Sequence, residues 1–476
     1  MRAEAFSAVR WTSFVTIARV VLQTLQLMVL ARLVAPADFG LMAMIVSITA
    51  FIQLFADLGV SNSIIHARQI SHEVLSTLYW LNVAVGAALS LAIWLASPAA
   101  ADFYGEPALV TPLSLAGLSF FLLAIGQQVK VLAEKRLAFR SVALVEMTSA
   151  VVSTIVAIVA AYQGAGVYAL VLAVLTLTGG NSILYFLFVR DGWLPGFHLR
   201  FREASSHLKA GAFLLGTSLA NTFAMQSDVI IIGRILGSAA LGAYTVPREL
   251  CLKVMMATNP IMTRVGTPLM AKAQDDPDML RRIYLATIRM TSSVNFPIYA
   301  AMATFRHEIT LVVFGPQWAG SADLLGILAV WGMFRSLGNP VGSLLYATGN
   351  AKLALVQSLS VAVALSLVIA FSASFGLWVA ASAMTLFYVL FVFALWAFVL
   401  RRIIDVGLWD YTKQWLVPLA ITVPTSLAAY GAAMAVEPAI LRLAVGLAAG
   451  GAIYTMTSFL CNRVWFTAMM QLARRT

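Results

Sequence analysis

Charged side chains inside long apolar runs are the residues of this sequence best placed to carry chemistry. Arg19, Lys253 and Arg335 each lie well inside such a run. A charge at the centre of a membrane span costs about 2.5–3.5 kcal/mol on insertion scales, so three of them facing lipid would together cost about as much as the stability of a whole domain. We therefore expect these side chains to face a water-filled cavity or a partner.

Two further bases and one acid complete the candidate cavity residues. Arg248 and Arg289 lie nearer the ends of their runs, where a long side chain can instead extend to the membrane surface. The acid is Asp228, which lies inside another run. Glu146 and Glu249 are the other acidic residues that we count inside the runs. Because bases outnumber acids inside the runs, the expected interior is cationic and suited to an anionic substrate.

One charge pair has a spacing that favours a structural role. Glu249 precedes Lys253 by four residues, which is the favourable order for an ion pair along one face of a helix. The spacing predicts a bridge between these two side chains, and this bridge is the alternative to a role for Lys253 in a cavity.

Sequence motifs for catalysis and metal binding are absent. The chain has no Walker loop, no G-x-S-x-G and no H-E-x-x-H sequence. Cys251 and Cys461 lie in or beside apolar runs, and no cluster of Cys and His suggests a metal site. We expect no catalytic residue, no metal, no cofactor and no enzymatic activity.

Composition identifies the elements that must position these charges. Of the 476 residues, 61% are hydrophobic and 11% are charged, whereas a soluble domain has about 25% charged residues. A span needs about 20 apolar residues, so the length allows about fourteen membrane helices. The expected fold is an all-α membrane protein, because long apolar runs favour helices over a barrel. We place the spans at about 12–34, 39–61, 75–97, 109–129, 141–162, 166–189, 210–233, 242–270, 282–305, 321–346, 353–373, 376–400, 412–433 and 439–461.

The positions of the basic residues predict the orientation of the chain. The formal net charge is +11, and most Lys and Arg residues fall in loops on the side of the N-terminus. On the opposite side we assign Arg32, Arg234, Arg306 and Arg442. Such asymmetry predicts that both termini of this multi-pass membrane protein are cytoplasmic. The positive charge is thereby explained without nucleic acid.

Internal repetition divides the chain into halves. The sequence Ala31–Gly40 resembles Gly233–Gly242, and Phe103–Pro107 resembles Val313–Gln317. Six predicted spans separate the copies, so the two halves have the same orientation, as in parallel-repeat transporters. We expect an N-terminal six-helix lobe, a cytoplasmic linker, a C-terminal six-helix lobe, and two additional helices with a cytoplasmic tail at residues 1–190, 191–209, 210–400 and 401–476.

Five segments in order resemble a known family. They are Leu30–Gly40 with Phe55–Gly59, Phe103–Pro107, Ser227–Arg234 and Val313–Trp318. From about residue 10 to 400 the chain is similar to the polysaccharide-transporter flippases, most of all to the Wzx-type members. This family belongs to the multidrug/oligosaccharidyl-lipid/polysaccharide superfamily.

The resemblance implies two six-helix lobes around a central cavity that opens alternately to either side. It implies as substrate an oligosaccharide repeat unit linked to polyprenyl pyrophosphate, used for exopolysaccharide or lipopolysaccharide biosynthesis. Arg19 and Asp228 lie in or near matched segments, so a role in the cavity is carried over to them. The implied partners of this protein are this substrate and membrane lipids, and the implied location is the bacterial inner membrane. A coupling cation and other polysaccharide-assembly proteins stay open.

Two other functions stay open. A cation-coupled drug antiporter of the same superfamily would need an acidic cavity, whereas bases predominate here. A membrane polymerase or ligase of the polysaccharide pathway would need a large outer loop with paired basic and acidic residues, and the predicted loops are short.

Overall fold

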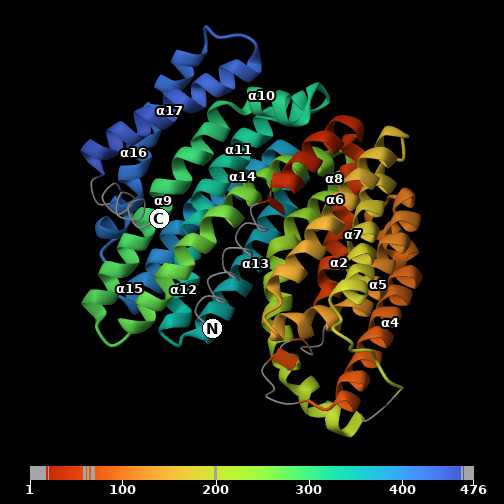
Figure 1. The fold of residues 1–476 in the computed structure, drawn as a ribbon. Coiled ribbons are helices and arrows are strands. Elements are labelled where there is room, and N and C mark those ends of the chain that lie inside the picture. The colour runs from red at the N-terminus through yellow and green to blue at the C-terminus, as the bar shows by residue number, and fades with distance from the viewer. Residues whose placement is uncertain are drawn as a thin grey trace. The chain divides into compact units, whose positions relative to one another are not determined.

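The computed structural model describes residues 18–19, 21–56, 61, 64–65, 70–197, 201–462 and 465, without the side chains of 201–217, 260–262 and 264–265. Within these ranges the chain is helical and has no strand (Figure 1). The expected all-α membrane fold is therefore confirmed. Contacts between residues divide the chain into two compact units, Met1–Gly242 and Ala243–Thr476.

Within the described ranges, eleven helices are long and apolar enough to cross a membrane. This is three fewer than the fourteen predicted spans. The first is represented by a shorter apolar helix, Val21–Leu33. The seventh and eighth fall within a single helix, α8 (Phe201–Lys272). The ninth corresponds to α9 (Pro277–Thr304), which is long but more polar. The number fourteen stays a prediction.

The N-terminal unit is built from helices packed in sequence order. Its helices after Val21–Leu33 are α2 (Pro36–Gln53), α4 (His72–Tyr104), α5 (Val110–Lys135), α6 (Phe139–Tyr162) and α7 (Val167–Phe188). Helix α4 packs against α5, α6 against α7, and α5 also against α7. The Ser71 hydroxyl caps α4 by accepting a hydrogen bond from the Val74 amide at 3.3 Å. Gly105, in the left-handed conformation, ends the helix.

Helix α8 changes direction at Gly237. This glycine has φ 78°, which is not helical, so α8 consists of two helices joined at a sharp bend. The amide of Ser238, which begins the second helix, donates to Glu106 Oε1 at 2.8 Å. Glu106 belongs to the repeated segment Phe103–Pro107, and the helix that it caps begins inside another repeated segment, Gly233–Gly242. The bend accounts for two predicted spans inside one helix.

The two copies of the longer repeat touch each other reciprocally inside the N-terminal unit. A Cβ atom on Gly40 would overlap the carbonyl oxygen of Ser238, and a Cβ atom on Gly242 would overlap that of Pro36. Ser238 and Gly242 occupy the same places in the second copy as Pro36 and Gly40 in the first. The contact is therefore self-complementary, like that across a twofold axis.

The C-terminal unit is held together by α9, which contacts helices distant in sequence. The unit continues through α11 (Ala322–Ser336), α12 (Asn339–Ala347), α13 (Ala351–Ala373), α14 (Leu377–Leu395), α16 (Leu408–Ala433) and α17 (Ala439–Cys461). Helix α9 packs against α11 and α16. Helix α16 packs in turn against α17, which lies beside it in Figure 1.

The expected linker and the observed units fall at different places in the chain. Helix α8 begins at Phe201, inside the stretch 191–209. The boundary between the compact units lies after Gly242, because the start of the second helix of α8 packs on Pro36 and Gly40. The division into lobes at 190 and 210 stays a prediction.

Candidate functional site

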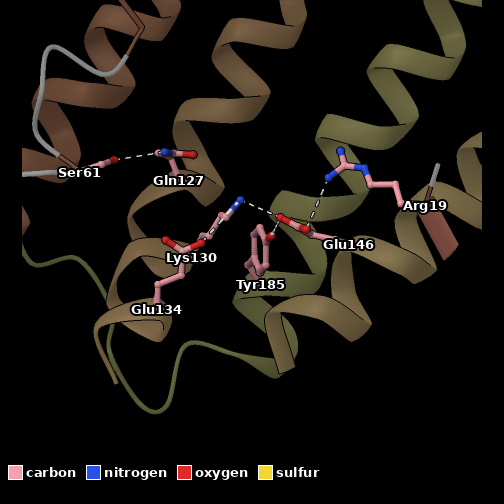
Figure 2. Close-up of polar contacts among 7 residues, drawn as sticks. All are labelled: Arg19, Ser61, Gln127, Lys130, Glu134, Glu146 and Tyr185. Atoms are coloured by element: carbon pink, nitrogen blue, oxygen red, sulfur yellow. Dashed lines mark hydrogen bonds and ion pairs between the residues drawn. The ribbon is translucent and has the colours of Figure 1, made fainter. Parts of the chain in front are cut away.

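A partly buried carboxylate in the N-terminal unit accepts two hydrogen bonds and makes an ion pair with a further base (Figure 2). Glu146 Oε1 lies 2.7 Å from Lys130 Nζ and accepts a hydrogen bond from the Tyr185 hydroxyl at 3.2 Å. Glu146 Oε2 lies 3.6 Å from an Nη atom of Arg19. We call Arg19, Lys130, Glu134, Glu146 and Tyr185 the Glu146 cluster.

The cluster draws its members from four helical segments. Arg19 precedes the helix Val21–Leu33, Glu146 lies on α6 and Tyr185 on α7. Lys130 and Glu134 are one turn apart on α5, with 3.8 Å between Nζ and Oε1. The packing of α7 against both α5 and α6 brings the three helices to one carboxylate.

The cluster is electrically balanced, and its members differ in exposure. It has two basic and two acidic side chains, so its formal charges cancel. The Glu146 side chain is 18% exposed, whereas that of Arg19 is 39% exposed. A buried carboxylate is stable only when it is paired and hydrogen-bonded. Of the two bases, Arg19 lies farther from Glu146 and is the more exposed, 39% against 30% for Lys130.

A neutral polar pair lies beside the cluster. Gln127 is one helical turn before Lys130 on α5, and its Nε2 donates to Ser61 Oγ at 3.2 Å (Figure 2). This pair extends the polar surface of α5 beyond the charged residues.

Arg335, in the C-terminal unit, is held by aromatic side chains. Its guanidinium carbon lies 5.1 Å from the Trp331 ring centre and 5.4 Å from that of Tyr388. An Nη atom donates to the Tyr388 hydroxyl at 2.7 Å. Among the described residues, no carboxylate lies within ion-pairing distance of Arg335. The arrangement fixes the direction of the guanidinium and leaves its charge available to an anion.

Two other predicted bases are also fixed by specific contacts. Arg289 donates from Nε to Asn462 Oδ1 at 2.9 Å. Arg248 is 4% exposed, so it does not extend to the membrane surface, and one Nη atom lies 3.5 Å from Glu249 Oε1.

The predicted bridge between Glu249 and Lys253 is wrong. Both residues lie in the described part of the chain, and no ion pair joins them; Glu249 pairs with Arg248 instead. An exposed pair along a helix contributes only a few tenths of a kcal/mol, whereas an unpaired buried charge costs much more. Glu249 therefore adds one contact to the buried Arg248 and makes no bridge along its helix. Lys253 is partly buried, and its place in a cavity stays a prediction.

Asp228 is 3% exposed on the first helix of α8, in the N-terminal unit. It follows Ser227, which is also buried. Its burial is as expected for a charged residue inside an apolar run, and its role in the cavity stays a prediction.

Sequence reasoning missed three members of the Glu146 cluster. Lys130 and Glu134 fall outside the predicted span 109–129, whereas α5 continues to Lys135. Their spacing of four residues was a usable signal for a helix. Tyr185 gave no signal, because a tyrosine in an apolar run is an ordinary core residue.

Comparisons with known proteins decide the family. The family described as "Polysaccharide biosynthesis protein" matches residues 29–323. The chain belongs to this family. It is 31% identical to the teichuronic acid biosynthesis protein TuaB of Bacillus subtilis (strain 168), over 95% of this chain and 94% of that one. It is also 31% identical to the lipopolysaccharide biosynthesis protein WzxC of Escherichia coli (strain K12), over 73% and 70% of the two chains.

Members of this family share their fold with transporters of known structure. The lipid II flippase MurJ, in an inward closed conformation, superposes with a TM-score of 0.70 at 12% identity, over 94% of this chain and 98% of that one. An inward-facing multidrug resistance transporter of the MATE family gives 0.63 at 14% identity, over 87% and 98%. These identities establish the fold alone.

Proposed function

We propose that this protein is a flippase that moves polyprenyl-pyrophosphate-linked oligosaccharide repeat units across the inner membrane, for exopolysaccharide or lipopolysaccharide biosynthesis. Its family relatives are named for the biosynthesis of teichuronic acid and lipopolysaccharide. Its fold is shared with a lipid II flippase. The observation that carries the proposal is Arg335, a membrane-embedded cation that no described carboxylate neutralises.

The charge of the proposed substrate gives Arg335 a function inside an apolar run. A pyrophosphate carries negative charge and cannot cross hydrocarbon unaided. A guanidinium binds phosphate oxygens through two parallel hydrogen bonds. The Trp331 and Tyr388 rings hold Arg335 without adding negative charge, so its attraction for the pyrophosphate is not reduced.

The Glu146 cluster, within the N-terminal unit, offers a separate and weaker contact for an anion. In the absence of substrate, Glu146 is the counter-ion of Arg19. A pyrophosphate oxygen competes with that carboxylate for the guanidinium, so binding exchanges one anion for another. Such exchange keeps affinity modest, which a transporter needs for release on the other side.

We further propose alternating access by rocking of two six-helix lobes, residues 1–190 and 210–400, as the family resemblance implies. The two C-terminal helices stand outside that repeat. We propose no catalytic residue and no cofactor. Membrane lipids surround the protein, and a coupling cation and other polysaccharide-assembly proteins are further partners to be tested.

A deletion strain tests the function. Loss of the protein should stop surface polysaccharide and leave lipid-linked repeat units on the cytoplasmic face, and a plasmid copy should restore export. Normal polymer together with increased sensitivity to cationic drugs would instead indicate an antiporter and would overturn the proposal.

Reporter fusions test the proposed orientation, with both termini in the cytoplasm. Fusions at Gly105, Gly164 and Gly315 should report outside, and those at Arg200 and Asp405 should report inside. A reversed result at any two of these positions contradicts the topology.

A further inference from the structure

A groove lies on the C-terminal unit where α9 ends and α11 begins. Its volume is about 580 Å³. Its mouth is formed by Arg306 and Asp323, and its wall by α11 and by Trp378 of α14. None of these residues belongs to the Glu146 cluster or to the surroundings of Arg335.

The mouth of the groove is a fixed pair of opposite charges. Arg306 Nε donates to Asp323 Oδ1 at 2.8 Å, and an Nη atom donates to the Ala303 carbonyl at 3.3 Å. A Cβ on residue 326 would lie 2.8 Å from Arg306 Cδ, so Gly326 makes room for the arginine stem. His307 Nε2 lies 3.6 Å from the same carboxylate oxygen. Both charged groups stay partly exposed.

The groove becomes apolar away from its mouth. Ile327 and Val330 follow Asp323 along α11 and line the groove together with the exposed Trp378 ring. The seven residue-to-residue steps of helix from Asp323 to Val330 extend about 10 Å. A polar end joined to an apolar strip of this length fits the headgroup and upper acyl chain of a phospholipid.

The charges of the mouth select the kind of headgroup. An anionic headgroup would be attracted by Arg306 and repelled by Asp323, because the pair is balanced. A zwitterionic headgroup satisfies both, with its phosphate on the guanidinium and its ammonium on the carboxylate. A primary ammonium can donate hydrogen bonds to that carboxylate, whereas a quaternary one has no N–H.

We propose that this groove binds a phospholipid whose headgroup joins a phosphate to a primary ammonium, as phosphatidylethanolamine does. The phosphate lies on Arg306, the ammonium on Asp323, and an acyl chain along Ile327, Val330 and Trp378. In the expected topology, the mouth faces the outer leaflet. The site is separate from the transport function and does not depend on it.

The test is lipid binding to the purified full-length protein, measured by native mass spectrometry. Phosphatidylethanolamine, phosphatidylcholine and phosphatidylglycerol with identical acyl chains are compared. Phosphatidylethanolamine should bind about tenfold more tightly than phosphatidylcholine, the effect of one or two charge-assisted hydrogen bonds. Equal binding of these two lipids, or tighter binding of phosphatidylglycerol, would overturn the proposal.

Variants locate the site. Asp323→Asn should remove the preference for phosphatidylethanolamine and shift binding toward phosphatidylglycerol, because Arg306 remains. Arg306→Gln should weaken the binding of phosphatidylethanolamine and of phosphatidylglycerol. The matched control is Asp191→Asn, which breaks another exposed pair, Arg136–Asp191 at 2.6 Å, and should leave the preference unchanged. A preference retained in Asp323→Asn, or lost in the control, contradicts this location.

A photoreactive lipid provides a readout independent of affinity. Phosphatidylethanolamine with a photoreactive acyl chain should label the peptide that contains Ile327 and Val330. Labelling confined to other helices would show that the lipid binds elsewhere.

Discussion

The two units place charges in the membrane in opposite ways. In the Glu146 cluster, Arg19 and Lys130 contact a carboxylate, and the cluster is balanced. In the C-terminal unit, Arg335 is supported by aromatic rings and a phenol hydroxyl. Both arrangements lower the cost of a cation in a low-dielectric environment. The first leaves little net attraction for an anion, whereas the second preserves it.

The largest expected effect comes from removing the cation that is not neutralised. Arg335→Ala should insert and fold, because a costly charge is removed. It should lower the rate of export about 30-fold or more, the effect of losing a charged hydrogen-bonding group of about 2–3 kcal/mol. The measurement is surface polysaccharide in the complemented deletion strain.

Two controls accompany this variant. Arg335→Lys keeps the charge but loses the planar stacking, so its export should be intermediate. Arg402→Ala removes an exposed arginine near a helix end and should export normally. Normal export by Arg335→Ala would show that the difference between the units does not matter for transport. It would also contradict the proposed contact between Arg335 and the pyrophosphate.

The next effect concerns stability in the N-terminal unit. Glu146→Gln leaves two bases without their shared carboxylate and should lower the free energy of unfolding by about 1–3 kcal/mol, less than for a fully buried pair because both bases are partly exposed. Thermal unfolding in detergent measures the change.

A double variant shows whether the loss is electrostatic. Arg19→Gln combined with Glu146→Gln should regain part of the stability, because one uncompensated charge is removed. Strictly additive losses of stability would mean that Arg19 and Glu146 do not interact. The ion pair between them would then not contribute to the stability of the Glu146 cluster.

The smallest expected effects on export come from Tyr388 and Tyr185, the tyrosines that contact the charges of each unit. Tyr388→Phe keeps the ring beside Arg335 but removes its hydrogen bond, and should lower export by a few-fold. Tyr185→Phe removes one of the two hydrogen bonds that Glu146 accepts and should change export less. If Tyr185→Phe has the larger effect on export, the order of importance of the two units is reversed.

Membrane helices were predictable because their signal is local. Long apolar runs determine spans, and nearly all of the expected spans coincide with observed helices. The bend at Gly237 was indicated only by the gap between two predicted spans. Its support by Glu106, more than a hundred residues away, depends on packing that no local pattern contains.

The site was only partly predictable. Arg19 and Arg335 stood out because a charge in an apolar run is costly wherever it points. Their partners did not, since Tyr388 and Tyr185 look like core residues until the fold brings them to a charge. The error at Glu249 has the same origin: helical spacing favoured Lys253, but burial of Arg248 decided the pairing.

The reciprocal contact of Gly40 and Gly242 has a consequence for how the chain tolerates change. Each glycine faces a backbone carbonyl, so an added methyl group cannot be accommodated by rotating a neighbouring side chain. Two identical half-length chains facing one another would make this contact with a single codon. In the duplicated chain two codons must each remain glycine, so the number of single mutations that disrupt the contact is doubled.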